Sequence, residues 1–156
     1  MIPSLFSYNR FVSRLILIFL CCVYCTTSLA FNLVGAWQLV SIEKQDKNGA
    51  WQPDCNSPTG LLIYTSNGYM AAGINCMSST NANQPSFDPK DETFYLGKYN
   101  INGKFVEHNA LNASSADYYG KTLKREILIV SANEMILQIR NTQGHLVQLK
   151  WYRLTK

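Results

Sequence analysis

The chain has 156 residues, which by length alone corresponds to one domain. Hydrophobic residues make up 47% of it, so a disordered chain is excluded and a core can be buried. The formal net charge is +4, but two of the fourteen basic residues, Arg10 and Arg14, precede an N-terminal apolar run, which leaves twelve against ten acidic residues beyond it. Without clustered Lys and Arg, this excess argues against nucleic acid as a partner.

The first 30 residues have the three-part pattern of a secretory signal peptide. An apolar run of about eleven residues at 15–25 follows the two arginines, and small Ser28 and Ala30 precede a predicted cut after Ala30. The run is shorter than the roughly 20 residues that span a bilayer. We predict a cleaved signal at 1–30, a secreted or periplasmic domain at 31–156 and no stable membrane insertion after cleavage. A retained membrane anchor is the alternative.

The remaining chain is strand-like, with short apolar segments separated by turn signals every eight to twelve residues. This spacing is typical of an all-β fold, and closing an antiparallel up-and-down meander of about eight strands into a barrel would remove its exposed edges. The predicted strands are 34–44, 60–65, 69–76, 93–101, 104–112, 121–130, 135–140 and 145–154.

Three hairpin turns connect these strands. Asn67-Gly68 predicts a two-residue type I′ turn, which requires positive φ at both residues, and Asn102-Gly103 has the same chemistry. Residues 141–144 predict a further hairpin. The polar stretch 77–92 is too long for a tight turn, so we expect a loop that is either a lid or a solvated linker.

Removal of the signal peptide would leave Cys55 and Cys76, an even pair in a protein destined for an oxidising compartment. The predicted hairpin brings Thr59 near Cys76, and Cys55 lies only four residues further out. We therefore predict a Cys55–Cys76 disulfide, with two unpaired thiols as the alternative.

Alternation along the first and last strands puts Trp37 beside Leu39, and Arg153 beside Trp151, on faces that could point inward. An arginine above a tryptophan ring gains cation–π energy, and Arg125 is the alternative to Arg153 as the partner of Trp37. We predict that Trp37 and Arg153 close one end of the barrel.

Alternation also puts His108 on one face with Val106 and Ala110. Arg125 shares a face with the aliphatic residues Leu123, Ile127 and Ile129. In a functional interpretation Arg125 holds an anionic group of a ligand, and His108 is a second donor or a proton carrier. In a structural interpretation Arg125 pairs with Glu107 or with backbone carbonyls, and His108 is a hydrogen-bonded core residue.

Several sequence segments together resemble the lipocalin-like domain family of small, mostly bacterial and fungal proteins. They are LVGAWQLVS, GLLIYTSNGYMAA, YLGKYNINGKFVEHNALNASSADYYGKTLKRE and LKWYR. The family pattern of a His, a Gly and an Arg falls on His108, Gly120 and Arg125. Members usually carry a proline and a tryptophan between the His and the Gly, where this chain has Ala116 and Tyr118. The resemblance implies a lipocalin-like (calycin) barrel.

These observations predict a protein that binds a small, mainly hydrophobic or amphipathic molecule in the barrel. Six tyrosines could line such a cavity: Tyr64, Tyr69, Tyr95, Tyr99, Tyr118 and Tyr119. The ligand-binding candidates are His108, Arg125, Tyr99 and Trp151. No metal site is expected, because His108 and His145 lie in separate strands without ligand spacing, and no cofactor is expected.

Two other functions stay open. Some fungal members of the family occur among small-molecule biosynthetic enzymes, so the resemblance allows a cofactor-independent isomerase or cyclase acting on an apolar metabolite. His108 would then be its acid/base residue. The other alternative is a structural or interaction barrel filled by its own side chains, which a cavity below roughly 300 Å³ would favour.

Overall fold

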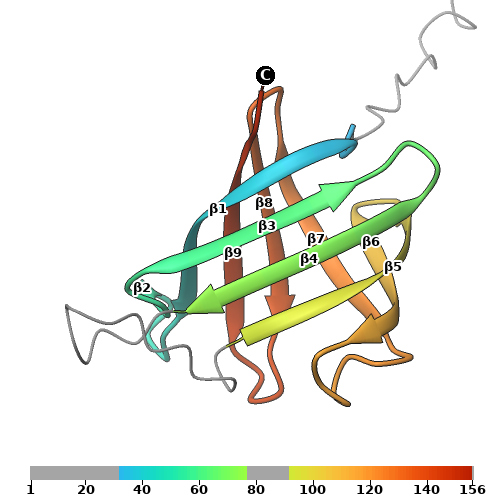
Figure 1. Ribbon diagram of the computed structural model, residues 1–156. Helices are drawn as coiled ribbons and strands as arrows, with labels where there is room; N and C mark the ends of the chain where they lie inside the picture. The colour runs from blue at the N-terminus through green and yellow to red at the C-terminus, as the bar shows by residue number, and fades with distance from the viewer. Residues whose placement is uncertain (1–31, 77–91, 156) are drawn as a thin grey trace, which may run out of the picture. The chain divides into compact units, whose positions relative to one another are not determined.

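The computed structural model describes residues 32–76 and 92–155 (Figure 1). The predicted signal peptide at 1–30 and nearly all of the predicted loop at 77–92 lie outside the described residues. In the part of the chain that is described, no helix is long and apolar enough to cross a membrane.

Nine strands form one antiparallel sheet in which each strand, in the order β2-β1-β3-β4-β5-β6-β7-β8-β9, pairs with the next. An additional pairing of β1 with β9 closes eight of them into a barrel, so the predicted all-β up-and-down barrel is confirmed (Figure 1). The strands are β1 (Gly35–Gln45), β2 (Trp51–Pro53), β3 (Pro58–Tyr64), β4 (Tyr69–Cys76), β5 (Glu92–Asn102), β6 (Phe105–Ala113), β7 (Thr122–Val130), β8 (Glu134–Arg140) and β9 (Leu146–Arg153).

The extra strand β2 was not predicted, because its three residues are too few to show an alternating pattern. It pairs with the end of β1, where Gln45 lies opposite Trp51. On the same side, β1 pairs with β3 only near its beginning, from Gly35 to Gln38. The 11-residue β1 is thus longer than the edge that β3 covers, and β2 covers part of the remainder.

The β3–β4 hairpin has a three-residue loop instead of the predicted two-residue type I′ turn. Asn67 cannot form that turn because no residue other than glycine has positive φ in the described residues, whereas Gly68 has φ of 85°. The Gly68 N–H donates to the carbonyl of Thr65 (3.2 Å), and the Thr65 N–H donates to the carbonyl of Tyr69 (2.9 Å). The loop therefore corresponds to a turn followed by a glycine bulge.

This loop shifts the register by one residue from the prediction. Cys76 lies opposite Pro58 instead of Thr59. Tyr64 accordingly faces Met70, and Leu62 faces Ala72, and all four side chains are buried. A one-residue slip would turn one of the two strands inside out, so the loop geometry decides which side chains enter the barrel.

The β5–β6 turn differs from its prediction in the same way. Asn102 pairs with Phe105, so the loop consists of Gly103 and Lys104 instead of Asn102 and Gly103. Gly103 has φ of 58°, as the first loop position of a type II′ turn requires. The predicted hairpin at 141–144 is confirmed.

A bulge in β7 turns the side chain of Ile129 to the face opposite the one predicted. Ile127 pairs with Leu137 but Ile129 pairs with Ile136, so Leu128 is an extra residue on the β7 side. The extra residue shifts the alternation, and Ile129 is 46% exposed. The prediction that Ile129 shares a face with Arg125 and Ile127 is therefore wrong.

Trp37 and Arg153 lie opposite each other where β1 begins and β9 ends. The Arg153 guanidinium carbon is 3.9 Å from the centroid of the fully buried Trp37 ring, a cation–π distance. The Trp37 indole N–H donates to the carbonyl of Leu33 (2.8 Å). That this pair seals one end of the barrel stays a prediction.

Arg153 also donates hydrogen bonds to backbone carbonyls from separate segments, those of Ala132 (2.6 Å), Asn32 (2.9 Å) and Val34. Gly35 leaves room for this, because a Cβ at that position would lie 2.5 Å from an Arg153 nitrogen. Gly35 also has φ of 140°, a conformation that favours glycine.

Replacing Arg153 by lysine should lower the free energy of unfolding by about 2 kcal/mol, measured by urea denaturation. Lysine keeps the charge but has neither a planar group to stack on Trp37 nor the fork of donors for the carbonyls. Arg140→Lys, at an exposed position on β8, is the control and should change stability by less than about 0.5 kcal/mol. Equal losses in the two variants would contradict a special role for Arg153.

Candidate functional site

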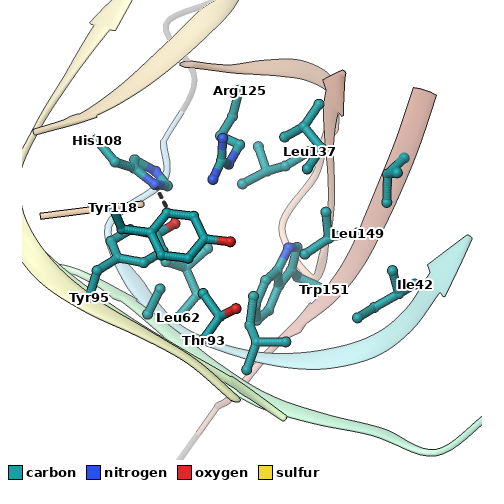
Figure 2. Close-up of a pocket in the computed structure, with 14 residues that line it drawn as sticks. Ile42, Leu62, Thr93, Tyr95, His108, Tyr118, Arg125, Leu137, Leu149 and Trp151 are labelled. Carbon is teal, nitrogen blue, oxygen red and sulfur yellow. Dashed lines mark hydrogen bonds between the residues drawn. The ribbon is translucent and has the colours of Figure 1, made fainter. Parts of the chain in front are cut away.

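The barrel interior contains a cavity of about 160 Å³ (Figure 2). Its lining is mainly aliphatic, with a few polar side chains among these residues. The polar or amphipathic lining residues are Thr93, Tyr95, His108, Tyr118, Arg125 and Trp151. An apolar concavity with a few convergent polar groups is the usual form of a small-molecule site.

The cavity lies toward the end of the barrel opposite Trp37 and Arg153. Ile42 and Ile74 near the ends of β1 and β4, and Thr93 near the start of β5, line it and are half-buried. In an up-and-down barrel these strand ends meet at one end. Leu62 and Tyr95, which line the cavity from further inside, are buried.

His108 on β6 is buried, with 1% of its surface exposed, and both of its ring nitrogens are hydrogen-bonded. The Tyr64 hydroxyl lies 2.6 Å from Nε2, and the Tyr95 hydroxyl lies 2.9 Å from Nδ1. Figure 2 shows the second of these bonds at the wall of the cavity. Neither nitrogen is left free for a ligand, as in the structural interpretation of His108.

The electrostatics of this network keep its members uncharged. Burial, and secondarily the positive charge of Arg125, lowers the pKa of His108 from 6.5 to about 3. Burial raises the pKa of Tyr64 well above its usual value and also raises the pKa of Tyr95. At neutral pH the three side chains therefore form a neutral hydrogen-bonded unit.

Arg125 on β7 lies opposite Val106 and enters the cavity from the side next to His108 (Figure 2). Its guanidinium donates to the carbonyl of Lys124 (3.2 Å). Among the described residues it forms no ion pair, and Glu107 instead accepts a hydrogen bond from Asn100 (3.1 Å). The alternative pairing with Glu107 is therefore not found.

The structure brings three of the four ligand-binding candidates together, since His108, Arg125 and Trp151 all line the cavity. Tyr99 is not among the lining residues. Its hydroxyl donates to the carbonyl of Thr65 (3.0 Å), and its ring packs edge-on against Tyr64. Tyr99 is half-buried and lies toward the C-terminal end of β5, whereas the cavity mouth is at the N-terminal end of that strand.

Sequence reasoning did not single out Tyr64, Tyr95 and Tyr118 from the other tyrosines. Alternation could have identified Tyr64 with Leu62 as inward. The β5–β6 register puts Tyr99, not Tyr95, opposite His108, so only the folded interior brings the Tyr95 hydroxyl to the His108 ring. Tyr118 is in the β6–β7 connection, and its ring stacks on Tyr95 with centroids 5.8 Å apart. It thus supplies an aromatic wall from outside the regular strands.

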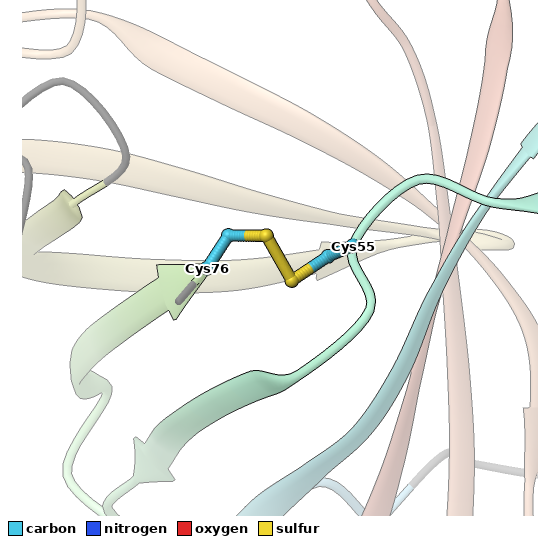
Figure 3. Close-up of a disulfide and its surroundings, with 2 residues drawn as sticks. All are labelled: Cys55 and Cys76. Atoms are coloured by element: carbon cyan, nitrogen blue, oxygen red, sulfur yellow. A yellow bond between two sulfur atoms is a disulfide. The ribbon is translucent and has the colours of Figure 1, made fainter. Parts of the chain in front are cut away.

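Cys55 and Cys76 form the predicted disulfide (Figure 3). Their Cα atoms are 5.8 Å apart, and the bond ties the segment before β3 to the end of β4, near the mouth of the cavity. Because disulfides persist in oxidising compartments, the bond indicates an extracytoplasmic location.

Replacing both Cys55 and Cys76 by serine should lower the free energy of unfolding by about 3 kcal/mol, from the lost constraint on a loop of roughly 20 residues. Denaturant unfolding with and without reductant measures this. Reductant should destabilise the unsubstituted protein and leave the double variant unchanged. Equal sensitivity of both proteins would refute the contribution of the bond.

The folded-state pKa of His108, about 3, lies below the unfolded value of 6.5, so as pH falls through this window only the unfolded chain takes up the proton. Stability should therefore fall by up to about 1.4 kcal/mol per pH unit from this group. Urea denaturation from pH 7 to pH 4 should show a shallower decline in His108→Gln than in the unsubstituted protein. His145→Gln should keep the original slope, and identical slopes for all three proteins would contradict the prediction.

In the described ranges 32–76 and 92–155, no group of three or more His, Cys, Asp and Glu side chains could hold a metal ion.

Comparison with solved structures found matches at low sequence identity. An uncharacterised protein from Bacteroides eggerthii is 13% identical with a TM-score of 0.47, and the match covers 79% of this chain and all of that one. A redesigned β-barrel is 11% identical with a TM-score of 0.42, covering 79% and 92% of the two chains. A de novo designed fluorescence-activating β-barrel is 11% identical with a TM-score of 0.41, covering 78% and 94%.

No curated protein matches the chain significantly. The sequence profile of the family described as "Lipocalin-like domain" matches residues 34–153, from just before β1 to the end of β9, and so spans the entire barrel. By this match, the chain belongs to the lipocalin-like domain family.

Proposed function

We propose that this protein binds a small, mainly apolar molecule inside its barrel. The observation that carries the proposal is the interior cavity, in which aliphatic side chains from several strands surround a small group of polar ones. Membership of the lipocalin-like domain family is compatible with such binding.

The volume of the cavity limits the size of the ligand. At about 160 Å³ it falls short of the roughly 300 Å³ from which drug-sized ligands are accommodated. It is close to the size of an engineered apolar cavity of about 150 Å³ that binds benzene. The proposed ligand therefore has about the size of one six-membered ring with a short substituent.

The proposed site of action is outside the cytoplasm, in the secreted or periplasmic space after cleavage following Ala30. The disulfide supports an oxidising compartment, and the signal-peptide pattern at 1–30 supports export. N-terminal sequencing of the protein recovered from its host tests the cleavage position.

A barrel filled by its own side chains is the second candidate, and the small cavity volume favours it over a carrier of large ligands. The two candidates differ in whether a ring-sized molecule raises the melting temperature. A ligand at 100 times its Kd stabilises the folded state by about 2.7 kcal/mol, whereas a filled barrel gains nothing.

Thermal unfolding with toluene, phenol or benzoate tests the proposal on matched variants of β4. Ala72 is buried and lines the cavity, while its neighbour Ala71 faces the opposite side of the strand. Ala72→Ile should fill the cavity and abolish the rise in melting temperature caused by the ring compounds. Ala71→Ile adds the same side-chain volume outside the cavity and should retain the rise in melting temperature.

The proposal fails if none of the three compounds raises the melting temperature of the unsubstituted protein. It also fails if the rise survives equally in Ala72→Ile, because binding would then lie elsewhere.

A further inference from the structure

At the wall of the cavity, one buried polar atom has no hydrogen-bond partner among the described residues. Trp151 lines the cavity and is 3% exposed, and within residues 32–76 and 92–155 no atom accepts a hydrogen bond from its buried indole Nε1. In Figure 2 this nitrogen is turned toward the side of the cavity where Arg125 enters. An indole N–H is only a donor, and leaving a buried donor unsatisfied is costly, so the atom points to an acceptor that the ligand brings.

The hydrogen-bond network of His108 supplies a second donor. Tyr64 is fully buried, and within the described residues His108 Nε2 is the only hydrogen-bond partner of its hydroxyl. Because a buried hydroxyl proton needs an acceptor, Tyr64 donates to Nε2. Neutral His108 then carries its proton on Nδ1 and donates it to the Tyr95 oxygen.

Tyr95 is thereby left with its own hydroxyl proton to donate. Its oxygen already accepts from His108, and its side chain lines the cavity. Tyr64 and His108 thus act as positioning residues that fix Tyr95 as a donor.

Arg125 is the third donor and the only charged side chain that lines the cavity among the described residues. A guanidinium has five N–H groups and no acceptor. One donates to the Lys124 carbonyl, and the charge and hydrogen bonding of Arg125 also act on the Tyr95 hydroxyl, where they oppose the rise in the pKa of Tyr95. The polar groups that face the cavity are therefore mostly donors. The hydroxyls of Thr93 and Tyr118 can donate or accept hydrogen bonds, so they do not alter this excess of donors over acceptors.

Resting on the proposed function, we propose that the ligand is a monocarboxylate on a single apolar ring. The carboxylate oxygens accept hydrogen bonds from Arg125, Tyr95 and Trp151, whose side chains come from β7, β5 and β9. The ring lies against aliphatic side chains of the cavity, among them Leu62, Leu137 and Leu149. A planar guanidinium matches a carboxylate in geometry as well as in charge.

Three isosteric probes separate this proposal from binding of the ring alone. Benzoate offers only acceptors and a negative charge, benzamide offers a donor and an acceptor, and benzamidinium offers only donors and a positive charge. Isothermal titration of the full chain at pH 7 should show benzoate binding about tenfold or more tighter than benzamide, and no binding of benzamidinium. Toluene, which has the ring without a polar group, is the fourth probe.

The outcomes separate the inference from the proposed function. If benzamide or benzamidinium bound as tightly as benzoate, the carboxylate proposal would be overturned. The proposed binding of a small molecule in the barrel would not be affected by that result. No binding of benzoate, benzamide, benzamidinium or toluene would overturn the proposed function, and the inference with it.

Two variants with matched controls assign the preference to the named residues. Arg125→Met should remove most of the preference for benzoate over benzamide, whereas Arg140→Met should retain it. Trp151→Phe should lower the affinity for benzoate about fivefold or more, because it removes the unpartnered donor. Trp37→Phe, whose indole N–H is bonded to Leu33, should lower stability and leave benzoate affinity unchanged. An undiminished benzoate preference in both Arg125→Met and Trp151→Phe would overturn the assignment.

Discussion

Hydrogen bonding between β1 and β9 joins the ends of the meander and leaves the eight-stranded ring without a free edge. Once the ring is closed, each strand alternates between one interior and the outer surface, so register alone decides which side chains enter. The same ladder places Arg153 opposite Trp37 at one end and Trp151 opposite Leu39 further along. Packing at that end and the wall of the cavity therefore depend on one pairing of strands.

The interior combines an apolar lining with a small polar network around His108. An imidazole in such an interior is costly unless both nitrogens are satisfied, and two tyrosine hydroxyls satisfy those of His108. Burial and the charge of Arg125 keep His108 neutral, and the bond to its Nδ1 holds the Tyr95 hydroxyl at the wall of the cavity. The structural interpretation of His108 is therefore compatible with the proposed binding role, in which His108 positions Tyr95 and does not itself contact the ligand.

Local patterns predicted much of the fold, namely the main strands, the hairpins, the closed barrel and the disulfide. They failed where a single residue changes register. At Asn67-Gly68 the dipeptide favoured a two-residue loop, but side-chain and backbone bonds of Thr65 to Tyr69 stabilise a longer loop. In β7 the extra residue Leu128 turned Ile129 outward, a change that alternation cannot reveal. Of the four predicted ligand-binding residues, His108, Arg125 and Trp151 line the cavity and Tyr99 does not, although Tyr99 lies opposite His108 in the β5–β6 register. Their role in binding stays a prediction.

The sequence by itself determined the properties that depend on neighbouring residues in the chain: strand alternation, turn positions, an even cysteine pair and membership of a family. Only the tertiary structure decided that Tyr64 and Tyr95 bond the two sides of His108 and that the Trp151 N–H has no partner in the part of the chain that the structure describes. These residues lie on β3, β5, β6 and β9, and they meet only because the closed ring brings distant strands around one interior. The relative level of side chains on different strands follows from cumulative register around the ring, to which each loop and bulge contributes, and no local pattern encodes that sum.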